Sequence, residues 1–295
     1  MKKTAFIAIV GRPNVGKSTL LNAILGEKVA IVSKKPQTTR NRITGIYTEG
    51  ENQYVFLDTP GIHKPRTKLG DFMVKTTSQT LGGVDSAILV VEAREEVGDI
   101  EAQVISRLKA DGIRAILVIN KIDTVRPANI AKTIAAYAEK FDFDAVIPVA
   151  AKNGKGVDIV ISECERYLDE GDWFFPDDIV TDQPERQVAA EIIREKLLRM
   201  LEEEIPHGTA VTIEEWKETG GLVSIRAEIY CEKASHKGII IGKGGATIKK
   251  IGTYARADIE KMLDSRVFLD LYVRVKENWR DSNFNINDFG FKEDM

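Results

Sequence analysis

Residues 11–19, with the sequence GRPNVGKST, constrain this chain more than any other stretch. They fit the pattern G-x-x-x-x-G-K-[ST], in which a glycine-rich turn brings several backbone N–H groups onto one polyphosphate. A short apolar run at residues 6–10 precedes the turn, and an apolar helical pattern at residues 20–25 follows it. This strand–loop–helix setting predicts a phosphate-binding loop in which the Lys17 ammonium reaches the phosphates and the Ser18 hydroxyl ligates Mg²⁺.

Composition sets broad limits on the class of protein. The 295 residues are enough for two domains, and 43% hydrophobic residues can supply a core. The net charge of −3 argues against a surface that binds nucleic acid all over. Cys164 and Cys231 lack metal-binding spacing and indicate reduced thiols in a cytoplasmic protein. The apolar run before residue 11 is too short for a signal sequence, and no stretch approaches the roughly 20 apolar residues of a membrane span.

A polar loop at residues 29–42 carries two neighbouring threonines, Thr38 and Thr39. In a nucleotide switch, a hydroxyl from such a loop completes the coordination of Mg²⁺ when the γ-phosphate is present. The residues alone leave open which of the two threonines does so, and whether the loop is only a polar surface segment. Two strand patterns, at residues 43–48 and 53–57, follow around a turn.

The second of these strands ends in the sequence Asp58-Thr59-Pro60-Gly61. An Asp at the carboxyl end of a strand faces the crevice in which α/β folds bind ligands. We expect Asp58 to hold Mg²⁺ through water and the Gly61 N–H to bond the γ-phosphate. Residues 62–83, which carry Gly, Thr, Ser and Lys, are expected to form a mobile switch segment.

The sequence Asn120-Lys121-Ile122-Asp123 predicts which base is bound. It follows two continuous apolar runs, residues 86–92 and 114–119, which predict buried parallel strands with helices between them. The Asp123 carboxylate can accept N–H bonds from N1 and N2 of guanine, whereas adenine lacks the exocyclic amine there. A site built on such bonds can reject the wrong base by roughly 10⁴–10⁵.

Further contacts with the base come from neighbouring loops. Asn120 is expected to bond N7 and to tie the loops together, while the Lys121 stem covers the ring. A sixth strand at residues 146–149 leads into residues 150–152, which are placed to contact the base through their backbone.

In this order, the motifs resemble those of the translation-factor-related GTPases. The match is weakest at Ala150, where Ser is usual. The resemblance implies a domain over residues 1–172 with a mostly parallel six-stranded sheet flanked by helices. It implies that GTP and GDP are bound by Gly11, Arg12, Pro13, Asn14, Val15, Gly16, Lys17, Ser18, Thr19, Asp58, Thr59, Pro60, Gly61, Ile62, Asn120, Lys121, Ile122, Asp123, Ala150, Ala151 and Lys152.

The expected reaction is hydrolysis of GTP by in-line attack of water. The resemblance assigns Mg²⁺ to Ser18, Thr39 and Asp58, and it assigns catalysis to Lys17, Thr39, Gly61 and Asn14. Ile62 stands where Ras-type enzymes carry a Gln that orients the water, so we predict slow turnover, on the order of 10⁻⁴–10⁻² s⁻¹.

Charge in the transition state needs a further source. Asn14 matches the residue with which related GTPases hold K⁺, and K⁺ then takes the place of an arginine finger. The alternative donors, Arg12, Arg40 and Arg42, are each expected to be solvated loop residues.

The remainder of the chain predicts a linker at residues 173–184 and an α+β domain at residues 185–295. An apolar stripe between residues 188 and 201 predicts a helix that residues 206–208 end. A strand at residues 209–216, a Gly-Gly turn, a strand with alternating apolar residues up to Cys231, and another such strand at residues 267–275 follow. Two helices are expected between the last two strands.

The sequence Gly242-Lys243-Gly244-Gly245 lies between these two helices. By itself it could be only a tight helix–helix turn. The element order, however, resembles a KH domain of the prokaryotic type, in which such a loop presses on the sugar-phosphate chain of about four unstacked nucleotides. Residues 226–256 hold seven Lys or Arg and two acids, which suits RNA. The residues expected to bind RNA are Arg226, Lys237, Ile241, Gly242, Lys243, Gly244, Gly245, Ile248, Lys249 and Lys250. Trp279 either stacks on a base or packs the C-terminal tail.

A P-loop GTPase domain followed by a KH domain resembles the bacterial Era family over essentially the whole chain. The resemblance implies a monomeric, cytoplasmic factor for assembly of the 30S subunit, which binds the 3′ region of 16S ribosomal RNA and associates with the inner surface of the cell membrane. We hypothesise that residues 29–42 and 62–83 change contacts between the domains, so that GTP raises the RNA affinity.

The sequence leaves three alternatives to this function. The first is the same GTP control of a different structured or single-stranded RNA. The second is an RNA-modification GTPase, but the scattered His63, His207 and His236 offer no modification chemistry. The third is a binding scaffold with an inactive nucleotide site, which the intact Lys17 and Ser18 argue against.

Overall fold

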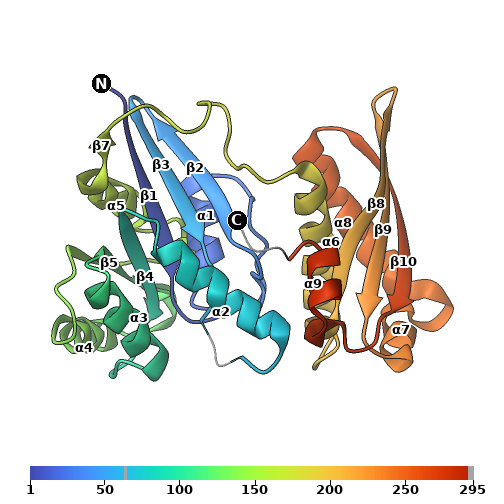
Figure 1. Ribbon diagram of the computed structural model, residues 1–295, viewed down its shortest axis with the longest axis horizontal. Helices are drawn as coiled ribbons and strands as arrows, with labels where there is room; N and C mark the ends of the chain where they lie inside the picture. The colour runs from blue at the N-terminus through green and yellow to red at the C-terminus, as the bar shows by residue number, and fades with distance from the viewer. Residues whose placement is uncertain (63–64, 292–295) are drawn as a thin grey trace. The chain divides into compact units, whose positions relative to one another are not determined.

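The computed structural model describes residues 1–62 and 65–291, which form two compact units (Figure 1). Unit 1 comprises Met1–Val32, Thr39–Pro65 and Gly70–Asp182, and unit 2 comprises Ser33–Thr38, Arg66–Leu69 and Gln183–Met295. Residues 63–64 of the expected switch segment and residues 292–295 of the expected tail lie outside the described residues.

Unit 1 is built on one twisted sheet. Its strands are β1 Lys3–Val10, β2 Ile43–Glu49, β3 Asn52–Asp58, β4 Ser86–Glu92, β5 Arg114–Asn120, β6 Ala145–Pro148 and β7 Asp169–Glu170. They lie in the order β2-β3-β1-β4-β5-β6, and β7 pairs with β1. Pairing is parallel except for β2 with β3 and β7 with β1, which are antiparallel. The mostly parallel sheet is therefore confirmed, with the two-residue β7 as a strand beyond the predicted six.

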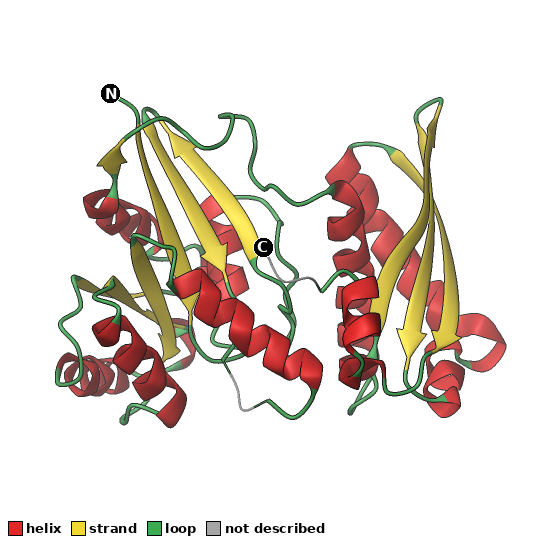
Figure 2. Cartoon of the chain, in the orientation of Figure 1, coloured by secondary structure: helices red, strands yellow, loops and turns green. Residues whose placement is uncertain are grey.

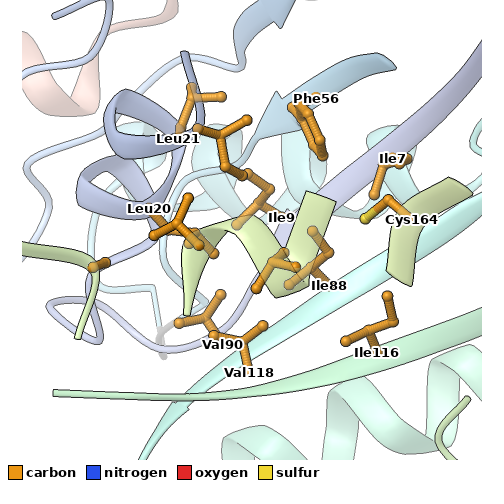
Figure 3. Close-up of a cluster of buried hydrophobic side chains, with 14 of the residues drawn as sticks. Ile7, Ile9, Leu20, Leu21, Phe56, Ile88, Val90, Ile116, Val118 and Cys164 are labelled. Atoms are coloured by element: carbon orange, nitrogen blue, oxygen red, sulfur yellow. The ribbon is translucent and has the colours of Figure 1, made fainter. Parts of the chain in front are cut away.

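Helices cover both faces of this sheet (Figure 2), because each central strand has apolar side chains on both sides. One face packs on α1 Lys17–Leu25 and α5 Val157–Cys164, in a cluster that includes Ile88, Val90 and Cys164 (Figure 3). The other face packs on α2 Lys68–Leu81, α3 Asp99–Ala110 and α4 Pro127–Ala138. With both faces buried, the sheet can offer a binding site only at the ends of its strands.

Within residues 62–83, which were expected to form a mobile switch segment, helix α2 occupies residues 68–81. Leu69 and Met73 are buried one helical turn apart, and Thr77 and Thr80 are buried further along. Three of these positions are four residues apart and form one face of the helix. Because two of the four are threonines, the stripe was not recognisable as a core pattern.

The segment that follows β7 is fastened to the β2–β3 hairpin of unit 1. The buried side-chain amide of Gln53 accepts the N–H groups of Phe174 (3.0 Å) and Phe175 (3.1 Å) and donates to the Phe175 carbonyl (2.9 Å). Further along, the Thr181 hydroxyl donates to the Thr44 carbonyl (2.7 Å). Contacts of this kind hold residues 174–181 against the edge of the sheet.

Unit 2 contains a three-stranded sheet, with strands β8 Ala210–Thr219, β9 Leu222–Cys231 and β10 Arg266–Val275. Strand β9 is central, antiparallel to β8 and parallel to β10. The helices are α6 Glu185–Met200, α7 Ala234–Ile241, α8 Ala246–Leu263 and α9 Asn283–Asp288. The predicted order of elements is confirmed, although α6 ends at Met200 rather than at the turn Pro206–Gly208.

The core of unit 2 follows from the alternation in β9. Val223, Ile225, Ala227, Ile229 and Cys231 are buried in one cluster with side chains of α6 and α8, while the residues between them lie on the opposite face of the sheet. Figure 1 shows α6 and α8 beside this sheet. Among the described residues of the whole chain, no helix is long and apolar enough to cross a membrane.

Trp279 belongs to the core of unit 2, so the prediction that it stacks on a base is wrong. Its side chain is 0% exposed, and its indole N–H donates to the Gly208 carbonyl (2.9 Å). Phe289 and Phe291 lie against the indole with ring centroids 5.2 Å and 6.1 Å away. The alternative prediction, that Trp279 packs the C-terminal tail, is confirmed.

We expect Trp279→Ala to lower the free energy of unfolding of unit 2 by about 3–5 kcal/mol, because it leaves a large cavity and an unpaired Gly208 carbonyl. Urea unfolding followed by circular dichroism measures this. The control is Phe284→Ala, because Phe284 is 75% exposed and its loss is expected to change stability by less than about 0.5 kcal/mol. Equal effects of the two substitutions would contradict the assignment of Trp279 to the core.

Candidate functional site

The predicted nucleotide motifs meet at the carboxyl ends of the parallel strands in unit 1. The Ile62 N–H, which follows β3, donates to the Gly11 carbonyl after β1 (3.3 Å). The Ile122 N–H, which follows β5, donates to the Val149 carbonyl after β6 (3.2 Å). Segments far apart in the sequence are thus brought to one edge of the sheet by the order of the strands.

The phosphate loop connects β1 to the start of α1, as predicted. Gly16 has φ +101°, and a Cβ there would lie 2.2 Å from the side-chain nitrogen of Asn120. Only glycine therefore fits this position. Helix α1 begins at the next residue, Lys17, so its first N–H groups and its positive end are available to an anion.

Lys17 is a buried cation in this loop. Its ammonium donates to the carbonyls of Gly11 (3.1 Å) and Arg12 (3.0 Å). Burial lowers the pKa of Lys17 to about 8, although the Asp58 carboxylate opposes the shift. The ammonium is thus held inside the loop at a cost in solvation, and a phosphate beside it would offset that cost.

The hydroxyls of Ser18 and Thr39 and the carboxylate of Asp58 form one cluster. The Ser18 hydroxyl donates to Asp58 Oδ2 (2.6 Å) and lies 2.9 Å from the Thr39 hydroxyl. The Thr38 hydroxyl instead donates to the Lys35 carbonyl (2.7 Å). Of the two threonines that the sequence left open, the structure therefore brings Thr39 to this cluster.

This cluster fits Mg²⁺, which prefers oxygen ligands and commonly keeps several waters. Asp58 is fully buried, and its Oδ1 has no hydrogen-bond partner in residues 1–62 and 65–291. Burial raises the pKa of Asp58 to about 6, against the opposing effects of Lys17, Ser18 and Thr39. A buried carboxylate with an unpartnered oxygen beside two hydroxyls is a donor set that a divalent cation would complete.

Asn120 ties the base-side loops together through one buried side chain. Its amide N–H donates to the Val15 carbonyl in the phosphate loop (2.9 Å). Its Oδ1 accepts the N–H groups of Lys121 (2.8 Å) and Ala151 (3.1 Å). The expected link is therefore present, and it joins three separate segments of the chain.

The other base-side residues lie around this tie. The Lys121 ammonium contacts the Glu92 carboxylate and the Asn14 carbonyl (2.5 Å). Asp123 is exposed, in a short 3₁₀ turn Ile122–Thr124. Ala151 begins a second 3₁₀ turn, Ala151–Asn153, so this loop offers its backbone beside the Asn120 amide.

The segment after Asp58 is packed closely on the phosphate loop. A Cβ at Gly61 would lie 2.6 Å from the Pro13 nitrogen, so the two backbones touch. The buried Thr77 hydroxyl of α2 lies 3.0 Å from the Pro60 carbonyl and can donate to it. Ile62 is partly buried against the apolar cluster under α2, α3 and α4. Its side chain therefore packs as a hydrocarbon at the position where Ras-type enzymes carry a water-orienting Gln.

Two arginines near the site, Arg12 and Arg40, are not solvated loop residues, so the sequence-based expectation was wrong for them. Arg12 forms an ion pair with Glu101 of α3, which is only 2% exposed. Arg40 is 1% exposed. Glu101 lies 89 residues from Arg12, and no local pattern could have indicated the pairing.

The second candidate site is the loop between α7 and α8 in unit 2. Gly242 has φ +74°, and a Cβ there would lie 2.2 Å from the Thr247 hydroxyl. The next residues form a 3₁₀ turn, Lys243–Gly245, and α8 begins at Ala246. Lys243 and Gly244 are exposed, so the backbone of this turn is open to a ligand.

A groove of about 300 Å³ lies between α8 and β10. Ile248, Leu269 and Leu271 give it apolar walls, and Lys249 and Arg256 bring positive charge. Ile248 and Lys249 were expected RNA-binding residues. Arg256 of α8 was not among them. Leu269 and Leu271 were not either, because the sequence does not show which strand faces α8.

Arg226 does not lie on the side of the sheet that this groove uses. It falls between the buried Ile225 and Ala227 of β9 and therefore points away from α8. Its guanidinium lies over the Tyr272 ring, 4.6 Å from the centroid. The prediction that Arg226 binds RNA therefore needs a surface other than this groove.

Comparisons with known proteins match both parts of the chain. Residues 6–121 match the family model of the 50S ribosome-binding GTPases, and residues 204–280 match the KH domain model. GTPase Era of Ruminiclostridium cellulolyticum is 48% identical over 291 residues, covering 98% of each chain. GTPase Era of Clostridium kluyveri is 50% identical over 293 residues, covering 99% of this chain and 100% of the relative.

Two solved structures match over nearly the whole length. One is Era in complex with MgGDPNP and nucleotides 1506–1542 of 16S ribosomal RNA, with 38% identity, a TM-score of 0.95 and 99% of each chain covered. The other is an Aquifex aeolicus Era variant bound to GDP and AlF₄⁻, with 38% identity, a TM-score of 0.94, and 98% of this chain and 99% of that chain covered. Fold and site thus define a P-loop GTPase that carries a KH domain. Within that class, the chain belongs to the Era family, and it hydrolyses GTP.

We expect Asn120→Ala to lower the stability of unit 1 by about 2–4 kcal/mol, because three hydrogen bonds, two of them buried, are lost and their partners are left unpaired. Thermal unfolding of the nucleotide-free protein measures the change. Asn153→Ala is the matched control, since Asn153 is exposed at the end of a neighbouring turn. A change as small as that of the control would show that Asn120 does not hold the loops.

Proposed function

We propose that this chain is a GTP-controlled RNA-binding factor for assembly of the small ribosomal subunit, and that it binds near the 3′ end of 16S ribosomal RNA. The observation that carries the proposal is the match, over 99% of the chain, to Era solved with MgGDPNP and nucleotides 1506–1542 of that RNA. The nucleotide site and the groove beside the glycine loop give each of these two ligands a place in this chain.

For the nucleotide, Ser18, Thr39 and Asp58 would hold Mg²⁺, which would neutralise charge on the phosphates. Lys17 would bind the β- and γ-phosphates from inside the loop, and the Gly61 N–H would bond the γ-phosphate. Asp123 would accept two N–H bonds from guanine, because it is exposed beside the loops that Asn120 holds. Turnover would be slow, because Ile62 has no polar atom to orient the attacking water.

For the RNA, the turn Lys243–Gly245 would press on the sugar-phosphate chain, and the groove would take unstacked bases. Lys249 and Arg256 would attract the phosphates, while Ile248, Leu269 and Leu271 would contact the bases. We assign the GTPase domain to residues 1–172, the linker to residues 173–184 and the RNA-binding domain to residues 185–295. A monomer in the cytoplasm, with peripheral attachment to the membrane, completes the proposal.

The RNA affinity is expected to depend on the nucleotide. Binding of a labelled RNA with the 3′-terminal 16S sequence is measured by fluorescence anisotropy, with GDP or with GDPNP bound. We expect the GDPNP form to bind tighter by about 5- to 150-fold, the usual range for coupled sites, and RNA to raise the GDPNP affinity by the same factor.

A scrambled RNA of equal length and composition is the control for sequence. Equal affinity for the two RNAs would show that the 16S assignment is wrong. Equal affinity of the GDP and GDPNP forms for the 16S sequence would show that GTP does not control RNA binding.

We also propose that K⁺ bound at Asn14 speeds hydrolysis. Asn14 lies in the phosphate loop with φ +66°, a conformation that Asn tolerates, and it is exposed. We expect phosphate release in KCl to be at least about tenfold faster than in NaCl at equal ionic strength, which is about 1.4 kcal/mol of barrier. Asn14→Ala is expected to remove this difference. Equal rates of the unaltered protein in the two salts would contradict the role of K⁺.

A further inference from the structure

Strand β10 presents different chemistry on its two faces. Val267 and Val273 are buried against the helices, and Leu269 and Leu271 line the groove. The residues between them form the other face of the strand. That outer face reads Arg266, Phe268, Asp270, Tyr272 and Arg274.

The aromatic residues of this outer face are exposed. Phe268 is 59% exposed and Tyr272 is 39% exposed. A single exposed apolar side chain is ordinary, but these two lie on one face of one strand, with an arginine at either end. Aromatic rings with neighbouring cations are the surface on which single-stranded nucleic acids stack their bases.

Arg226 of the neighbouring strand β9 belongs to the same surface. It pairs in register with Asp270, and its guanidinium lies over the Tyr272 ring. Its Nε is buried, with no hydrogen-bond partner in the described part of the chain. The Arg226–Tyr272 pair thus offers a preformed flat surface with a positive charge, which suits a base and its phosphate.

The acids on this face are already engaged. Glu228 accepts from Arg274 (3.1 Å) and from the Tyr230 hydroxyl (2.8 Å). Asp270 is hydrogen-bonded to the Tyr272 hydroxyl. Negative charge is therefore partly offset next to the two rings.

The outer face is continuous with the groove. Strand β10 is at the edge of the sheet, and Leu269 and Leu271 in the groove alternate along it with Phe268 and Tyr272 outside. A strand of RNA that leaves the groove need cross only this one edge to reach the rings.

We propose that the outer face of β9 and β10, formed by Phe268, Tyr272 and Arg226, is a second RNA-binding surface, which stacks nucleotides of the same single strand after it leaves the groove. The proposal rests on the proposed RNA-binding function. It assigns this face to RNA. The test below distinguishes this from the alternative, in which a protein partner binds the same face.

The test compares two labelled RNAs, bound to the full-length protein with GDPNP. The first has five nucleotides and fills only the groove; the second has twelve nucleotides and contains the first. For Phe268→Ala/Tyr272→Ala, we expect at least about 30-fold weaker binding of the long RNA, since two stacked bases are lost, and unchanged binding of the short RNA. Phe268→Tyr keeps a ring at that position and is expected to bind both RNAs normally.

Two further variants define the controls. Phe284→Ala removes an aromatic side chain that is 75% exposed on α9, and it should leave both affinities unchanged. Gly244→Asp adds a negative charge in the glycine loop, at φ +58°, a strained conformation that Asp tolerates better than most residues, and with no atom within 4 Å of a Cβ; it should weaken both RNAs alike.

The proposal is overturned if the double variant binds the long RNA normally, and such a result would leave the face to a protein partner. It is also overturned if the double variant loses both RNAs equally, since the groove would then be the part affected. If the unaltered protein binds neither RNA, the proposed function itself is wrong, and the second surface falls with it.

Discussion

The side chain of Asn120 is the interaction on which the nucleotide site depends. One amide joins the phosphate loop, its own loop and the loop after β6, and its three partners are backbone groups. The positions of backbone groups do not depend on side-chain rotamers, so the sheet determines the geometry of these three hydrogen bonds. The parallel strands bring the loops to one edge, and the amide fixes their separation.

The same site holds charge where burial opposes it. Burial shifts the pKa of Lys17 and of Asp58 toward the neutral forms. Such an arrangement is unfavourable for folding alone, and it is typical of sites whose ligands bring opposite charges. Stability and ligand binding are therefore linked, because whatever binds the folded site offsets the cost.

Much of the fold and of the nucleotide site could be predicted, because the signals are local. The phosphate loop, the Asp58 and Asn120 motifs and the alternation in β9 each lie within a few consecutive residues. What could not be predicted depends on contacts between distant segments. The pairing of Arg12 with Glu101 is one such case, and the groove wall supplied by Leu269 and Leu271 is another.

The hydrogen bonds between the β2–β3 hairpin and residues 174–181 shorten the free stretch of chain that leads into α6. The last of the hydrogen bonds to the hairpin involves Thr181, and α6 begins at Glu185, so three residues remain between them. Fully extended, such a stretch reaches only about 10–14 Å. Because this linker is short, the effective concentration of each unit relative to the other is in the millimolar range or above.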